Sequence, residues 1–103
     1  MFGSQTYTSA QAAVVLIQPQ NNETIILRRV SIYCSNANSV NTQGAIGFGS
    51  RVVAGHPAIA AGSGFVELEP LGQGARGEAL TFTCGTPSGG SIQVNYTYDL
   101  YVV

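Results

Sequence analysis

The chain has 103 residues, and only 9% of them are Asp, Glu, Lys or Arg, against about 25% in typical soluble domains. It contains four arginines and no lysine, so it lacks the clustered basic residues of a nucleic-acid-binding surface. It has no apolar run of the roughly 18 residues that a membrane span needs, and its start shows no basic segment typical of a signal peptide. With so few charges, either Ser, Thr, Asn and Gln keep the surface hydrated, or further copies of the chain or a partner cover it, and the composition favours the second interpretation.

Residues 1–11 are small and polar apart from Phe2 and Tyr7. We interpret them as an extended N-terminal arm that is flexible or docks on a neighbour. The remaining residues, 12–103, are predicted to form one domain. Its first strand is predicted at 12–18, where a continuous apolar run indicates burial on both faces.

The longest predicted strand covers residues 24–35. Its even-numbered residues form a core face from Val30 onward, and Arg28 interrupts that face near the start, where its charged end can reach the sheet edge. Shorter strands are predicted at 45–48 and 51–53, with a candidate edge strand near 58–60. Glycines around these segments indicate bulges or tight bends.

Residues 64–84 read as strand, glycine-rich loop and strand, with the loop at 72–77 and clean alternation over 78–84. Residues 92–102 alternate throughout, with apolar side chains at the even positions. The chain therefore carries seven or eight short strands, separated by turn signals, and no segment with a helical period. This pattern predicts an all-β fold, an antiparallel β-sandwich or barrel.

The sequence of short strands resembles a group of small virion proteins of tailed phages, namely capsid decoration (cement) proteins and related β-sandwich modules of phage fibres. The segments that carry the resemblance are RRVSI in 24–35, GFG at 47–49, VVAG at 52–55, GFVELEP at 64–70, GEALTFT at 77–83 and IQVNYTY at 92–98. Two cysteines and a cluster of tyrosines near the end depart from the usual pattern.

The resemblance implies a jelly-roll-like sandwich that forms homo-oligomers, often trimers, on a virion surface. The implied partners are the chain itself and the major capsid protein or another virion protein, and the implied location is the virion, after synthesis in the cytoplasm of a bacterial host without a signal peptide. The resemblance transfers no catalytic residue.

The residues themselves point to no enzyme, cofactor or metal. His56 is the single histidine and has no ligand at metal-binding spacing. Glu67 and Glu69 share one face of a strand, but paired carboxylates need a cleft to act on a glycoside. Ser50 and Ser63 lack a visible histidine–acid partnership beyond His56.

Exposed aromatic residues are the better candidates for contacts. Tyr96 and Tyr98 fall on the apolar face of their strand, which favours core packing. The residues expected at an oligomer or partner interface are Phe2, Tyr7, Tyr33, Arg76 and Tyr101. Arg76 is expected to bind a carboxylate or carbonyl of another subunit, because its glycine-rich loop offers no local partner. The expected function is that of a non-enzymatic structural virion protein. The alternative is a carbohydrate-binding module or receptor-binding, lectin-like fibre domain with a glycan as ligand.

Cys34 and Cys84 point to the core by alternation, and we predict free, buried thiols. With strand 24–35 placed beside strand 78–84 in antiparallel pairing, as expected for a jelly roll, the two cysteines fall at opposite ends of the sheet. A disulfide needs Cα atoms within about 7 Å, and a reducing cytoplasm also disfavours the bond.

Overall fold

The computed structural model describes residues 1–49 and 51–103, without the side chains of residues 68–71. Eight strands occupy this part of the chain: β1 (Phe2–Tyr7), β2 (Gln11–Ile17), β3 (Glu23–Cys34), β4 (Thr42–Phe48), β5 (Arg51–Ile59), β6 (Ser63–Gln73), β7 (Leu80–Cys84) and β8 (Ile92–Val102). No helical segment among the described residues is long and apolar enough to cross a membrane.

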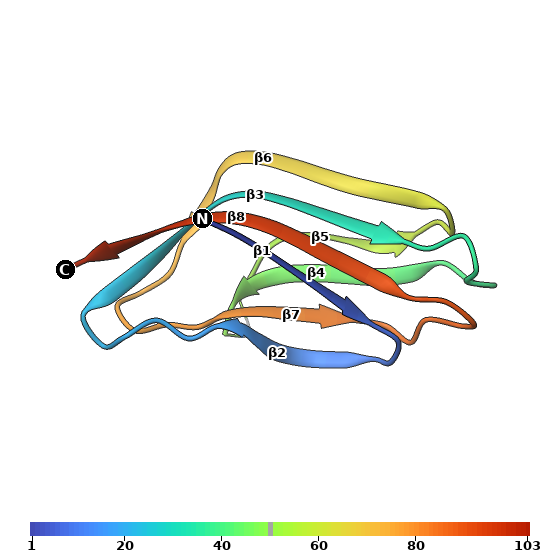
Figure 1. Cartoon of the computed structure of the whole chain (residues 1–103), viewed down its shortest axis with the longest axis horizontal. Helices are drawn as coiled ribbons and strands as arrows, with labels where there is room; N and C mark the ends of the chain where they lie inside the picture. Colours follow the sequence, from blue (N-terminus) through green and yellow to red (C-terminus); the bar gives the residue numbers. More distant parts are fainter. Residues whose placement is uncertain (50) are drawn as a thin grey trace.

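The strands form two four-stranded antiparallel sheets, in the orders β1-β8-β3-β6 and β2-β7-β4-β5, which face each other across the core (Figure 1). Only the connection from β4 to β5 stays within one sheet, and every other connection between the described strands crosses to the opposite sheet. Two packed sheets linked in this manner form a jelly roll. The all-β, jelly-roll-like sandwich predicted from the sequence is confirmed. The segments predicted separately at 51–53 and 58–60 are one strand, β5.

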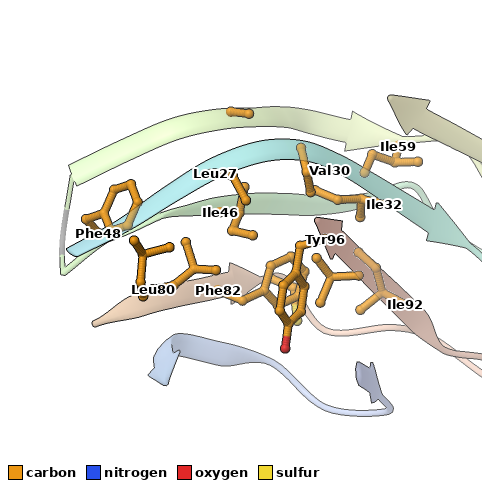
Figure 2. Close-up of a cluster of buried hydrophobic side chains, with 14 of the residues drawn as sticks. Leu27, Val30, Ile32, Ile46, Phe48, Ile59, Leu80, Phe82, Ile92 and Tyr96 are labelled. Carbon is orange, nitrogen blue, oxygen red and sulfur yellow. The ribbon is translucent and has the colours of Figure 1, made fainter. Parts of the chain in front are cut away.

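The core lies between the sheets and is built from the inward-facing residue at every second position (Figure 2). Its largest fully buried side chains are Phe48, Phe82, Ile25, Leu27, Ile32, Ile46, Leu80 and Ile92. Burying one such side chain is worth about 1.5–3 kcal/mol relative to leaving it in water. The alternation read from the sequence at 80–84 and 92–96 is therefore the alternation that forms the core.

A β-bulge at Arg28 explains why this residue interrupts the apolar face of β3. Leu27 is paired with Tyr98 and Arg29 with Thr97, so Arg28 is an extra residue opposite β8. An extra residue inverts the facing of the strand. Odd-numbered residues such as Leu27 point inward before the bulge, and even-numbered residues such as Val30 point inward after it.

The first residues of the chain belong to the sandwich, which corrects the predicted arm at 1–11. β1 pairs antiparallel with β8 over its whole length, from Phe2 opposite Thr97 to Tyr7 opposite Ile92. Its polar composition is compatible with a strand because β1 lies at a sheet edge, where one side meets solvent. The predicted extended conformation of these residues agrees with the structure. The prediction that they form an arm outside the domain was wrong for residues 2–7.

The cysteines lie in opposite sheets, which corrects the predicted strand order. β3, which ends at Cys34, pairs with β6 and β8, whereas β7, which ends at Cys84, pairs with β2 and β4. Both residues are buried, as predicted, and both are free thiols in the structure. The argument from neighbouring strands is wrong, because the choice of sheet partners is set by packing between distant segments rather than by local pattern.

Candidate functional site

The outer face of the β1-β8-β3-β6 sheet is the surface to which most of the predicted contact residues map. Cross-strand register places side chains of four strands in rows, for example Ser4, Asn95, Ser31 and Val66. The neighbours of these residues along the strands, such as Ile32 and Val94, are buried in the core. Since successive residues of a strand alternate between faces, the row itself points away from the core. The face is therefore defined by the odd positions of β8 from Gln93 onward and by their partners.

Uncharged hydrogen bonds tie this face together. The Ser4 hydroxyl donates to Oδ1 of Asn95 at 2.7 Å, and Nδ2 of Asn95 donates to the Ser31 hydroxyl at 3.3 Å. Nε2 of Gln93 donates to the Ser4 hydroxyl at 3.3 Å. The chain of bonds crosses β1, β8 and β3, so it holds three strands in a fixed register without using a charge.

A shallow depression of about 220 Å³ lies on this face beside Ser31 and Asn95. Its lining includes Phe2, Arg29, Ser31, Asn95 and Thr97. The Phe2 side chain is 69% exposed, and Arg29 is exposed as well. An apolar ring beside a cation and amide groups suits a protein or polar ligand contact rather than a chemical reaction.

Beyond the bulge, the face carries an ion pair. Nε of Arg28 donates to Oδ2 of Asp99 at 2.8 Å, and Nη2 donates to the Tyr101 hydroxyl at 3.3 Å. These bonds, first of all the one to Asp99, raise the pKa of Arg28. The bulge is what turns Arg28 outward to meet both partners, so the residue that broke the sequence pattern is a surface residue of this face.

Three of the five predicted interface residues lie on this face. Phe2, Tyr33 and Tyr101 are exposed there, and Tyr33 and Tyr101 are 42% and 44% exposed. The sequence analysis missed Ser31 and Asn95, although the uncharged polar residues at alternate positions of 93–97 were a visible signal.

The other two predicted interface residues are placed differently from expectation. Tyr7 packs against the core, where its ring stacks on Phe82 with a centroid distance of 5.7 Å. Arg76 is exposed, but its Nε donates to the backbone carbonyl of Asn21 at 3.0 Å, so it has a local partner after all. This ring contact could not be read from the local pattern, because Phe82 lies on β7 in the opposite sheet.

The candidate chemical residues do not assemble into a reaction centre in the described part of the chain. His56 is exposed, and its Nδ1 accepts a hydrogen bond from the Ala58 amide at 3.1 Å. A depression of about 230 Å³ brings His56 and Ser63 together, but its described lining holds no carboxylate. No group of three His, Cys, Asp or Glu residues that could hold a metal ion occurs among the described residues.

Two carboxylates and one serine are the remaining candidates. Glu67 is exposed on β6. Ser50 and the side chain of Glu69 lie outside the described residues.

No protein-family model and no curated protein sequence matches this chain. A similar solved structure is a chain of the acidic stable capsid of Helicobacter pylori bacteriophage KHP30. It superposes with a TM-score of 0.60 at 8% identity, over 100% of this chain and 93% of that chain. Infectious bursal disease virus Gt strain gives a TM-score of 0.30 at 12% identity, over 97% of this chain and 29% of that chain, which is too low to bear on the fold. The first similarity shows a shared fold over nearly the whole of both chains.

Proposed function

We propose that the chain is a non-enzymatic structural protein of a phage virion, a decoration (cement) protein that forms a homotrimer and binds the major capsid protein. The observation that carries the proposal is the full-length similarity in fold to a chain of a phage capsid. The 9% charged residues and the row of uncharged hydrogen bonds across the outer face add support, because both suit a surface covered within an assembly. In this proposal the chain is made in the cytoplasm of the host and ends in the virion.

Binding to capsid shells tests the proposal directly. The chain is co-expressed with the major capsid protein encoded near its own gene, and the shells are separated on a density gradient. We expect the chain to migrate with the shells and to raise the temperature at which they break open. A chain that stays at the top of the gradient, or a gene with no virion gene nearby, contradicts the proposal.

The trimer is tested on the chain alone by sedimentation equilibrium at low micromolar concentration. We expect a mass of three times 10.7 kDa. A closed ring would cover exposed valines such as Val15 and Val52, which are 52% and 63% exposed. A mass of 10.7 kDa at every concentration contradicts the trimer.

A glycan ligand is the second candidate, favoured by the depression beside the exposed Phe2 ring. Aromatic rings stack on sugars, and Asn95 and Arg29 supply polar groups next to the ring. A glycan array followed by titration of the best hit tests it, with Phe2→Ala as the variant. Binding that Phe2→Ala abolishes supports a lectin-like role, and a blank array opposes it.

A further inference from the structure

The sandwich has four edge strands, and three of them carry features that hinder the addition of a foreign strand. β2 has shifts of register after Gln11 and after Val15. β5 contains Arg51 and Pro57, and β6 contains Glu67. Bulges, prolines and charged residues are the devices by which natural sheets protect their edges. In Figure 1, β5 and β6 lie on one side of the molecule and β1 and β2 on the other.

β1 is the one edge strand, among the four that the structure describes, without such a device. It pairs with β8 over six consecutive residues with no shift of register, and its sequence, FGSQTY, has no charge and no proline. Residues 1–22 hold no Asp, Glu, Lys or Arg at all. An edge of this kind is open to pairing with another strand.

The free backbone groups of β1 can be identified. Met1 donates to the Tyr98 carbonyl at 2.8 Å and accepts from the Tyr98 amide at 2.9 Å, so these two residues form a hydrogen-bonded pair. In an antiparallel ladder such pairs alternate, so the odd residues of β1 turn their backbone groups to β8 and the even residues turn theirs away. The groups that face the free edge belong to Phe2, Ser4 and Thr6.

We infer that β1 is a self-association edge, at which two copies of this chain pair antiparallel across a two-fold axis. Edge pairing needs two unprotected strands, and β1 is the strand that each copy offers. Antiparallel pairing of a strand with its own copy creates a two-fold axis. With the axis at Ser4, Phe2 lies opposite Thr6 of the second copy. All three residues whose backbone groups face the free edge then have a hydrogen-bonding partner.

The chemistry around the axis suits a second copy. No charged side chains oppose each other there, since the first 22 residues hold no Asp, Glu, Lys or Arg, and the ammonium group of Met1 donates to the Tyr98 carbonyl of its own chain. The hydrogen-bonded row of Ser4, Asn95 and Ser31 meets its symmetry mate, so the polar outer faces of the two sheets become continuous. This contact goes beyond the proposed decoration role and needs no capsid. If that role holds as well, the contact joins neighbouring trimers.

Amide hydrogen exchange, followed by NMR at low and high protein concentration, tests the inferred register. We expect the Gly3, Gln5 and Tyr7 amides to be protected at both concentrations because they bind β8. The Ser4 and Thr6 amides are expected to gain about tenfold protection at the high concentration only, as they enter hydrogen bonds with the second copy. Exchange of Ser4 and Thr6 at the rate of exposed loop amides at every concentration overturns the inference.

Two variants test the edge by independent means, with self-association measured by sedimentation velocity over a dilution series. Ser4→Pro removes an N–H that faces the free edge and leaves the backbone hydrogen bonds to β8 intact, and it also removes the hydroxyl that bonds Asn95 and Gln93. Thr6→Lys leaves the backbone unchanged and places a charged side chain opposite the apolar ring of Phe2 in the second copy. Lysines on an edge strand hinder strand addition, so we expect association to weaken at least about tenfold. Val66→Lys is the matched control, since Val66 lies on the same outer face at the opposite, protected edge.

The result that supports the inference is weakened association in Thr6→Lys, with wild-type association in Val66→Lys. Ser4→Pro is expected to agree with Thr6→Lys provided that its thermal unfolding stays close to wild type. Equal association of Thr6→Lys and Val66→Lys overturns the inference, as does a wild-type chain that shows no concentration dependence. Because these measurements use the chain alone, failure to bind capsids in the earlier experiment leaves their outcome unaffected.

Discussion

The ring of Tyr96 in β8 occupies the space that a side chain would need at Gly3, its cross-strand partner in β1. Tyr96 is only 4% exposed, so its ring has little room to move aside. The edge strand is thus held against the sheet by an aromatic side chain that covers a glycine. This contact explains why a strand with little apolar character of its own remains attached to the sandwich.

Gly3→Ala is expected to destabilise the fold by about 1–3 kcal/mol, the usual cost of forcing an extra methyl group into a packed site. Urea unfolding monitored by circular dichroism measures the change. Gly64→Ala in β6 is the matched control, because a Cβ there would meet its nearest atom, the Ile32 carbonyl oxygen, at an ordinary 3.5 Å. In a Tyr96→Leu background the cost of Gly3→Ala should shrink, and an unchanged cost would contradict the clash.

Much of the core could be read from the sequence, because inward positions in β7 and β8 follow a strict alternation from Leu80 to Cys84 and from Ile92 onward. Alternation is a local signal, set by the geometry of a single strand. It breaks at Arg28, where one extra residue inverts the pattern. The charge of Arg28 marks the break in the sequence, but it does not identify the break as a bulge.

Sheet partners and the contacts of single side chains could not be read in this manner. The pairing of β3 with β6 and β8 depends on how the whole core closes. Asn38, which is buried, shows the same limit. Its Nδ2 donates to the Ser91 carbonyl at 2.9 Å, and its Oδ1 accepts from the Ser88 backbone N–H at 2.9 Å, both about fifty residues away along the chain. On the outer face, Tyr33 and Tyr101 followed from alternation, whereas Tyr7 depended on the ring of Phe82 in the opposite sheet.

Ala13 in β2 has a positive φ of 49°, a conformation that costs a residue with a Cβ roughly 1–2 kcal/mol. It lies within the register shift between Gln11 and Val14, and its amide donates to the Thr83 hydroxyl at 2.9 Å, which fixes the shape of the bulge. Ala13→Gly relieves the strain, and we expect stability to stay level or to rise by up to about 1 kcal/mol.

Ala12→Gly is the comparison for Ala13→Gly, because the φ of Ala12 is not positive. There the added glycine only increases the freedom of the unfolded chain, so a loss of about 0.5–1 kcal/mol is expected. Thermal unfolding of the two variants side by side measures the difference. Equal losses in both would show that the bulge is unstrained.

Thr42 is 2% exposed, and its hydroxyl has no hydrogen-bond partner among the described residues. Leaving such a group buried and unpaired costs about 1–3 kcal/mol. Thr42→Val keeps the shape and removes the hydroxyl, so we expect a gain in stability of about 1 kcal/mol. The control is Thr81→Val at a site that is 6% exposed, where the hydroxyl donates to the Gly49 carbonyl at 2.7 Å. That variant should lose stability, and a loss in both would refute the reasoning.

The final prediction concerns alkaline pH. Burial raises the pKa of Cys84 above its ordinary value of 9.0, although a hydrogen bond with the Gln11 backbone acts in the opposite direction. Burial also raises the pKa of Tyr7 and of Tyr96 above 10.0, helped for Tyr7 by the charge of Cys84. These groups are neutral when protonated, and the folded state holds their protons more tightly than the unfolded state does. Their contribution is therefore fully present below the unfolded values and is lost as the pH rises through the folded ones.

We expect the free energy of unfolding to fall as the pH rises from about 9 to 11, in the window that follows from these raised pKa values. Urea unfolding at closely spaced pH values, with a reductant present, measures the slope. Cys84→Ala should make the fall in stability shallower in the lower part of this pH range, and Tyr96→Phe should do so in the upper part. Each substitution removes one group whose pKa differs between the folded and the unfolded state. Tyr33→Phe, at a site that is 42% exposed, is the control for the loss of a tyrosine hydroxyl outside the core. Stability that stays constant up to pH 11, or that falls equally in all variants, would show that burial of these three groups does not govern the alkaline response.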